Sequence, residues 1–433
     1  MKLYTLLTCC IFLTACATTQ QLQGEQQNTL GDATILSPVE SSELVTQGLS
    51  QPRLARVDTA MRKYTDTQKL AGTVTLVARN QEIVHLSANG MRNLETNEEM
   101  TTDSIFRIYS MTKPITAVAA LTLWEQGKFH MYDPIEKYLP ELAELKVFAG
   151  MDGENMRLEP SDQPVRIIDL FLHTAGFSYG FTNSEVDKLY QALPPVSDND
   201  SVETVLQRIS ALPLNHQPGT QWHYGINTDI IGFLVERISG MKLGDYMQQI
   251  IFDPLQMTDT AFYVPLEKRN RLVQIYGPSE NLEIVALDEA PLGDFLSDPS
   301  VHNGGGGLVS TINDYYIFAQ MLLNGGEYNG QRILGRKTVE YLRSNHLPTN
   351  LIPFSPTSHG EGYALAMSVT VNSNDALLMG SNGDYGWGGA ASTYFRIDPK
   401  ENMVIIMMSQ FVPSAFYPVR HDFKNTVYQS LVD

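Results

Sequence analysis

The stretch FRIYSMTK, residues 106–113, decides how the rest of the sequence is interpreted. It contains a Ser-x-x-Lys motif, and Ser110 precedes a segment, residues 113–126, whose Ala and Leu residues recur at helical spacing. Residues three apart on a helix share one face, so we expect Lys113 to lie beside the Ser110 hydroxyl. A lysine that its surroundings keep unprotonated can take a serine's proton, and the backbone N–H at a helix start can stabilise an oxyanion. The stretch therefore predicts a nucleophilic Ser110 with Lys113 as its partner.

Two other motifs in the chain compete with this assignment, because a short motif also occurs by chance. SGMK, residues 239–242, is a second Ser-x-x-Lys, but Ser239 and Gly240 are expected to end a helix and Lys242 would lie beyond it. GFSYG, residues 176–180, fits the Gly-x-Ser-x-Gly elbow of α/β-hydrolases, which requires a strand before the serine and a helix after it. Residues 165–172 predict a helix instead, so we favour Ser110 over Ser178.

Strand patterns open and close the chain, and helical patterns fill its middle. Residues 72–78 and 82–87 predict a hairpin, and residues 363–371, 391–397 and 403–409 predict further strands. Helical spacing is found at residues 54–64, 165–172, 201–209, 228–238, 313–323 and 419–431. The order predicts an α/β fold of the α+β type, an antiparallel sheet built from both termini, with an all-helical domain inserted at roughly residues 120–360.

Further stretches occur in a recognisable order: DLFLHTAG (169–176), PGTQWHY (218–224) and IFDPLQMTDT (251–260). Together with FRIYSMTK they resemble the penicillin-recognising serine hydrolases, which comprise class C β-lactamases, D-alanyl-D-alanine peptidases and carboxylesterases of the same fold. The resemblance covers most of residues 54–431. It implies a β-lactamase/transpeptidase-like fold for residues 51–433 and an acyl-enzyme on the serine.

The resemblance also implies roles for residues at the second motif of the family, Tyr-x-Asn. Tyr224 occupies the tyrosine position, where it would serve as base and proton shuttle. Ile226 stands where the family has asparagine, and Asn227 follows one residue later, so the substrate contact expected of Asn227 is in doubt. His223 is an alternative base, although its position in the family pattern carries no catalysis.

The third motif of the family is Lys-Thr-Gly, and the best match here is Trp387-Gly388-Gly389. This resembles the esterase branch, in which Trp-Gly-Gly replaces Lys-Thr-Gly. A tryptophan cannot bind a β-lactam carboxylate as a lysine would, but it can pack against an acyl or alcohol group. The resemblance further implies that the N–H groups of Ser110 and Ala390 form the oxyanion hole.

The N-terminus predicts export and lipidation. Leu3 to Leu13 is apolar but too short to span a bilayer, and Leu-Thr-Ala before Cys16 resembles a lipobox. We expect a signal peptide at residues 1–15, a lipid on Cys16 and a flexible tether over residues 16–50; a plain secretory signal cut nearby is the alternative. The product would be a bacterial lipoprotein, anchored in the outer membrane and facing the periplasm. All three cysteines lie in this segment, so the mature chain would have no thiol for disulfides or catalysis.

Composition excludes other classes of function. The net charge is −18 and no basic cluster occurs, which argues against nucleic-acid binding. The nine histidines form no metal-binding motif, and the glycines at 303–307 lack the lysine of a phosphate-binding loop. We therefore expect no metal or cofactor, contact with a membrane only through the lipid, and a small ester or amide as substrate. The chain is interpreted as a serine hydrolase of small carboxylic esters; the alternatives are a β-lactamase or D-amino-acid peptidase at the same site, and a catalytically silent sensor.

Overall fold

The computed structural model describes residues 44–193, 196–197 and 199–433. The expected signal peptide, Cys16 and residues 16–43 of the expected tether lie outside these residues. Residues 44–50 of that tether are built into the fold, because β1 (Val45–Thr46) and β2 (Leu49–Ser50) form a ribbon against the C-terminal segment. Ser50 N donates to Ser430 O at 2.8 Å and Val432 N donates to Gly48 O at 3.0 Å.

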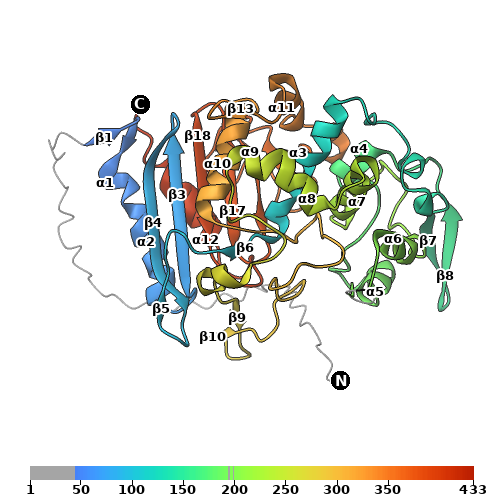
Figure 1. The fold of residues 1–433 in the computed structure, drawn as a ribbon, viewed down its shortest axis with the longest axis horizontal. Helices are drawn as coiled ribbons and strands as arrows, with labels where there is room; N and C mark the ends of the chain where they lie inside the picture. The colour runs from blue at the N-terminus through green and yellow to red at the C-terminus, as the bar shows by residue number, and fades with distance from the viewer. Residues whose placement is uncertain (1–43, 194–195, 198) are drawn as a thin grey trace, which may run out of the picture. The chain divides into compact units, whose positions relative to one another are not determined.

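An eight-stranded antiparallel sheet contains strands from both ends of the chain, in the order β14-β15-β16-β17-β18-β3-β4-β5 (Figure 1). β18 pairs with β3 from Met403 opposite Arg79 to Met408 opposite Val74, so the two ends of the chain meet inside the sheet. This confirms the predicted antiparallel sheet. The strands are β3 (Gly72–Arg79), β4 (Glu82–Asn93), β5 (Glu98–Glu99), β14 (Glu361–Tyr363), β15 (Ser368–Thr370), β16 (Tyr385–Gly389), β17 (Thr393–Asp398) and β18 (Met403–Met408).

Helices cover both faces of the sheet because its central strands are apolar on both sides. Along β18, Val404, Ile406 and Met408 pack into the same core as α3 and α10. The alternate residues Met403, Ile405 and Met407 pack with α2 and α12 on the opposite face. Each such buried side chain contributes about 1.5–3 kcal/mol, so the three layers hold one another in place.

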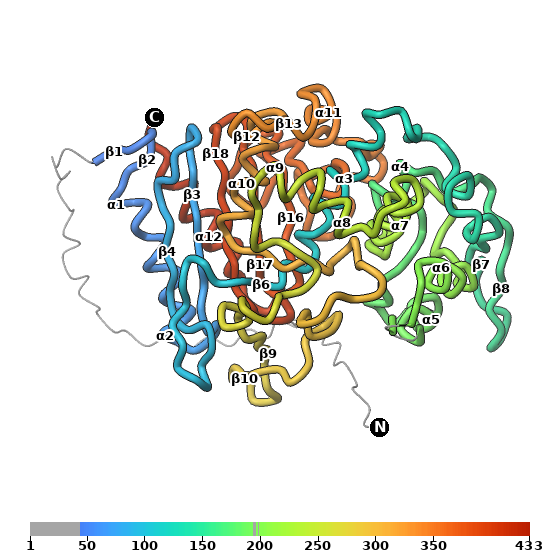
Figure 2. The backbone as a smooth tube through the Cα atoms, viewed as in Figure 1, coloured from blue at the N-terminus to red at the C-terminus, as the bar shows by residue number. Residues whose placement is uncertain are grey.

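Most of the remaining elements come from the part of the chain between β5 and β14, and many of them, including α4 to α7, lie to the right of the sheet in Figure 2. The helices are α1 (Gln51–Leu54), α2 (Arg56–Asp66), α3 (Thr112–Glu125), α4 (Ile167–Phe171), α5 (Glu185–Gln191), α6 (Val202–Ser210), α7 (Asn227–Ser239), α8 (Leu243–Met247), α9 (Asp253–Leu255), α10 (Ile312–Leu323), α11 (Arg336–Leu342) and α12 (Val419–Tyr428). Short ribbons are formed by β6 (Phe106–Arg107) with β11 (Val309–Ser310), β7 (Lys146–Asp152) with β8 (Asn155–Pro160), β9 (Tyr276–Pro278) with β10 (Ile284–Ala286), and β12 (Glu327–Tyr328) with β13 (Gln331–Arg332).

Two details differ from the sequence-based expectation. The inserted region is mainly helical rather than all-helical, because the Gly153-Glu154 turn lets residues 146–160 form the β7–β8 hairpin. Residues 363–371 do not form one strand. The chain turns through Ala366, whose φ is 62°, so that β14 and β15 form a hairpin. The turn is buried and its backbone is satisfied by neighbours: Ala366 N donates to Phe171 O at 3.0 Å.

α3 is apolar on nearly all of its surface and runs through the interior, as expected of a helix with no solvent-facing side. It packs mainly against α7, touches α8, and begins at the nucleophile motif. Within the described part of the chain, no helix combines the length and apolar character that a membrane crossing needs. No group of three histidine, cysteine, aspartate or glutamate side chains in that part is arranged to hold a metal ion.

Candidate active site

Ser110 lies in a tight 3-10 turn, Tyr109–Met111, which leads directly into α3. Tyr109 has φ of 43°, a left-handed backbone conformation that is unfavourable for a bulky residue. Such strain in the residue before an accessible serine is typical of functional sites, where the surrounding structure enforces it. The half-buried Ser110 lines a cavity of about 510 Å³, so its hydroxyl is available to a ligand.

Two side chains converge on the Ser110 oxygen. Lys113 Nζ lies 3.2 Å from Ser110 Oγ, and the Tyr224 hydroxyl lies 2.8 Å from the same atom. The structure therefore brings together the three residues that the sequence predicts as the catalytic group. Hydrogen-bond distances of this kind let a proton pass from the serine to whichever partner is unprotonated.

Lys113 is held in a closed environment, with its residue 1% exposed. Its Nζ donates to Gly305 O at 2.7 Å and lies 5.0 Å and 4.8 Å from the ring centroids of Tyr179 and Tyr224. The two rings pack around Nζ and hold it toward Ser110. Asp229 holds both of these Lys113 contacts in place. It accepts from Gly305 N at 3.0 Å and from the Tyr179 hydroxyl at 2.9 Å.

The loop that carries Tyr224 is fastened to residues 173–178, which comprise the end of the DLFLHTAG stretch and the two residues after it. His223 N donates to His173 O at 2.8 Å. Gly225 approaches the Phe177 carbonyl so closely that a Cβ at Gly225 would lie 2.1 Å from that oxygen. Because only glycine allows this approach, the two segments together fix the height of Tyr224 over Ser110.

The Trp-Gly-Gly motif forms the end of β16 and lies at the same cavity. Trp387 Nε1 donates to the Tyr224 hydroxyl at 3.3 Å. A Cβ at Gly389 would lie 2.2 Å from Ile108 O, so this strand end packs directly against the backbone that leads to Ser110. Ala390 is exposed and lines the cavity next to Gly388 and Gly389; its role as an oxyanion-hole donor stays a prediction.

Arg420, at the start of α12, belongs to the site and was missed by sequence reasoning. Its guanidinium donates to the carbonyl of Gly389. That carbonyl and the N–H of Ala390 belong to one peptide unit, so the hydrogen bond orients and polarises the group expected to hold the oxyanion. No motif surrounds Arg420, and only the packing of α12 against the sheet brings it here.

Asn227 is not brought to the cavity, in contrast to the role expected for it. It is fully buried at the first turn of α7, and its side-chain amide contacts His173 Nδ1 at 2.8 Å. The shift by one position explains the difference, because successive residues on a helix point about 100° apart. Ile226, at the matching position, has no polar group to offer a substrate.

Ser178 takes part in a polar cluster that the sequence did not reveal. Its Oγ donates to Asp187 Oδ1 at 2.5 Å and contacts His223 Nε2 at 3.2 Å. The serine stands between the acid and the histidine, whereas a catalytic triad places histidine in the middle. Ser178 is also buried and follows α4 instead of a strand. We therefore interpret the cluster as structural, with its hydrogen bonds holding the loop before Tyr224 in position. His223 is thereby engaged away from Ser110.

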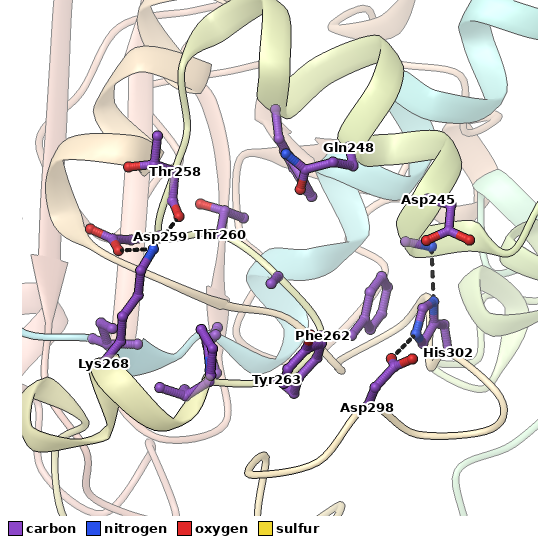
Figure 3. A pocket seen from close by; sticks show the side chains of 17 residues that line it. Asp245, Gln248, Thr258, Asp259, Thr260, Phe262, Tyr263, Lys268, Asp298 and His302 are labelled. Carbon is purple, nitrogen blue, oxygen red and sulfur yellow. Dashed lines mark hydrogen bonds and ion pairs between the residues drawn. The ribbon is translucent and has the colours of Figure 1, made fainter.

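Neither the second Ser-x-x-Lys motif nor the second cavity offers an alternative catalytic site. Gly240 ends α7 in the left-handed conformation, and Lys242 turns away to Asp298 at 2.8 Å, so Ser239 has no lysine partner. A second cavity of about 260 Å³ lies between α8 and the loop around Phe262 (Figure 3). His302 stacks there on Phe262 and contacts Asp298 at 2.9 Å. Its lining contains none of the predicted catalytic residues.

Comparison with known proteins agrees with this geometry. The family profile described as Beta-lactamase matches residues 57–427. The lovastatin esterase of Penicillium rubens is 30% identical over 394 residues, covering 86% of this chain and 96% of the relative. Esterase EstB of Burkholderia gladioli is 31% identical over 214 residues, covering 48% of this chain and 51% of the relative.

Among solved structures, simvastatin synthase (LovD) of Aspergillus terreus superimposes with a TM-score of 0.74 at 24% identity, covering 87% of this chain and 98% of that chain. This likeness confirms the β-lactamase/transpeptidase-like fold. The profile spans nearly the whole described region and includes Ser110, Lys113, Tyr224 and Trp387. The chain therefore belongs to the beta-lactamase family of serine hydrolases, with relatives in its esterase and acyltransferase branch.

Proposed function

We propose that the protein hydrolyses small carboxylic esters through a covalent acyl-enzyme on Ser110. The observation that carries the proposal is the convergence of Lys113 Nζ and the Tyr224 hydroxyl on one serine oxygen, at 3.2 Å and 2.8 Å. Named esterases among the relatives support the choice of substrate.

The reaction has two steps that use the same groups. In the first, Ser110 Oγ attacks the ester carbonyl while its proton passes to Tyr224 or Lys113, and the oxygen of the tetrahedral intermediate accepts from the N–H groups of Ser110 and Ala390. The proton is then delivered to the leaving alcohol as the acyl–Ser110 ester forms. In the second step water attacks that ester, loses its proton to the same pair, and the acid is released with Ser110 restored.

The third motif favours an ester over a β-lactam. Trp387 places an indole where the β-lactam-processing members have a lysine, and its Nε1 is directed at the Tyr224 hydroxyl. The cavity mouth carries exposed apolar side chains, Phe181 at 75% and Leu377 at 68% exposure, which suit an acyl or alcohol group. The alternative, a β-lactamase or D-amino-acid peptidase, would use the same serine. The two functions are distinguished by which substrate the protein turns over.

The test is intact-mass labelling by a fluorophosphonate probe, with turnover of 4-nitrophenyl acetate and nitrocefin measured beside it. We expect one label on the wild type, none on Ser110→Ala, and wild-type labelling on the matched control Ser239→Ala. Ester turnover should fall by about a millionfold in Ser110→Ala, as for loss of a serine nucleophile in a protease. Label retained on Ser110→Ala would contradict the nucleophile assignment; nitrocefin turnover equal to ester turnover would favour the β-lactamase alternative, and a stable adduct without turnover would favour the sensor.

A further inference from the structure

One wall of the Ser110 cavity is cationic, although the chain as a whole carries a net charge of −18. Arg396, Arg420 and Lys424 all line it. Two of these cations are neutralised inside the protein. Lys424 Nζ lies 3.0 Å from Asp384 Oδ2, and the Arg396 guanidinium pairs with the same aspartate and with Glu361, the latter at 3.3 Å.

The buried Asp384 shows that this pairing is strong. Burial by itself raises the pKa of a carboxyl group, but the positive charges of Arg396 and Lys424 outweigh burial and hold the pKa of Asp384 at about 2. Asp384 is therefore ionised at any ordinary pH. Arg396 and Lys424 are committed to it and to Glu361, which leaves them little attraction for a ligand.

Arg420 differs from its two neighbours because it has no carboxylate partner among the described residues. Its guanidinium donates to the Gly389 carbonyl, while Nε is shielded from solvent and has no hydrogen-bond partner in the described chain. Burial lowers the pKa of Arg420 to about 10, partly offset by Tyr394 and Tyr224, so it remains charged at neutral pH. The residue as a whole is half-buried and lines the cavity, so the rest of the guanidinium can meet a ligand. A partly shielded charge without a counter-charge is costly, and a bound anion would reduce that cost.

The position of Arg420 relative to the chemistry is set by Gly388. A Cβ at Gly388 would lie 2.7 Å from the guanidinium carbon, so the guanidinium occupies the space that a side chain at this strand position would need. The neighbouring peptide carries the Ala390 N–H expected at the oxyanion hole. An anion on Arg420 would thus lie in the same cavity as the ester carbonyl that Ser110 attacks.

We propose that Arg420 binds a carboxylate of the substrate, so that the preferred substrates are esters that carry a free carboxylate. The proposal rests on the proposed function, since it names the ester class that the same site takes. A guanidinium suits this role because its N–H groups form charge-assisted hydrogen bonds with carboxylates. The apolar mouth at Phe181 and Leu377 would receive the uncharged part of the molecule.

The carboxylate could be on the acyl part or on the alcohol part, and two matched substrate pairs distinguish these positions. The first pair is mono-4-nitrophenyl glutarate and its neutral methyl ester. The second is 3-carboxyphenyl acetate and its neutral amide, 3-carbamoylphenyl acetate. Turnover is measured with wild type, Arg420→Gln, Arg420→Lys and the control Arg62→Gln, which removes the same charge from an exposed side chain of α2.

The deciding quantity is the ratio of kcat/KM for the anionic ester to kcat/KM for its neutral partner. We expect the wild type to prefer one anionic ester by about tenfold or more, Arg420→Gln to bring that ratio close to one, and Arg420→Lys to keep part of it. Arg62→Gln should leave the ratio unchanged. Because Arg420 also holds the Gly389 carbonyl, Arg420→Gln will slow both esters, and the ratio cancels that common loss.

An unchanged ratio in Arg420→Gln, or no preference in the wild type for either pair, would overturn the inference while leaving ester hydrolysis intact. No turnover of any ester, or turnover that survives Ser110→Ala, would instead overturn the proposed function. If Arg420→Gln does not fold, competition in the wild type decides: glutarate should inhibit 4-nitrophenyl acetate hydrolysis and glutaramide should not. Equal inhibition by the two would refute the carboxylate site.

Discussion

Replacement of Tyr224 by phenylalanine removes one oxygen atom from the centre of the site. The ring itself is held by stacking on Trp222 at 5.9 Å between centroids and by His173 at 4.8 Å, so we expect it to stay in place. Two hydrogen bonds are lost, to Ser110 Oγ at 2.8 Å and from Trp387 Nε1 at 3.3 Å. Each contributes about 1 kcal/mol to stability, so the fold should survive.

The catalytic effect should be far larger than the effect on stability. A positioned acid–base group accelerates proton transfer by about 10²–10⁴, which corresponds to about 2.7–5.4 kcal/mol of barrier. We expect kcat for 4-nitrophenyl acetate to fall by that factor in Tyr224→Phe, with KM nearly unchanged, because the lost contact acts on the reacting serine and not on bound substrate. Stopped-flow should show both acylation and deacylation slowed.

The matched control is Tyr179→Phe, which removes a hydroxyl that donates to Asp229 and not to Ser110. Its ring also lies beside Lys113, so the two variants perturb similar surroundings and differ in the contact with the serine. We expect a loss smaller than about tenfold, as for a group outside the proton transfers. If Tyr224→Phe kept more than about a tenth of wild-type kcat, Lys113 alone would have to carry the proton and the reasoning would be refuted.

Three further changes test the framework around the site. Gly389→Ala would place a Cβ 2.2 Å from Ile108 O, so urea unfolding should show a loss of about 1–3 kcal/mol and ester turnover should fall more than about tenfold as β16 moves from the nucleophile turn. Asp384→Asn leaves buried cations such as Arg396 underneutralised and should cost about 3–5 kcal/mol of unfolding free energy in the same assay. Burial, and then the charges of Lys113 and His223, lower the pKa of His173 well below 6.5, so only the unfolded chain binds that proton. The contribution of His173 to the unfolding free energy should be fully present above pH 6.5 and fall by about 1.4 kcal/mol per pH unit below it, so the pH profile of His173→Gln should be shallower than that of the wild type by about this amount.

Each of these has a contrary outcome. Wild-type turnover in Gly389→Ala would show that β16 need not touch the nucleophile turn. A loss below about 1 kcal/mol in Asp384→Asn would equal that of an exposed ion pair, for which Glu327→Gln, which breaks the exposed pair with Arg332, is the comparison. Parallel pH profiles for wild type and His173→Gln would mean that this imidazole is protonated in the folded state.

The sequence anticipates those features that depend on local pattern. The strand predicted at residues 403–409 is found as β18, which is apolar and buried on both faces, and the helical run after Lys113 places that lysine against Ser110. Local pattern fails where a buried turn looks like a strand, as at Ala366. Such a turn is satisfied by Phe171 and Leu342, partners far away in the chain.

Residues whose role comes only from tertiary packing were not accessible to the same reasoning. Arg420 carries no motif and reaches Gly389 because α12 lies across the end of β16. Asn227 is the opposite case, a residue that was predicted to be in the site and is not. It is only one residue from the expected position, but that shift along the helix directs its side chain to His173. In a site built from several segments, the sequence thus predicts best the pair on one helical turn, Ser110 and Lys113. It predicts least well the residues that line the cavity from other segments, such as Arg420.

The pairing of β18 with β3 also constrains how the chain acquires its structure. Ser409 Oγ donates to Gly72 O across 337 positions, so the first strands made must wait for the last before the sheet can close. Contacts this distant in sequence are entropically costly to form and slow folding. Until the C-terminal strands arrive, β3 has an apolar edge with no neighbour, which favours aggregation. A chain shortened by its last thirty or so residues would lose β18 and α12 together, and with them the completion of the sheet.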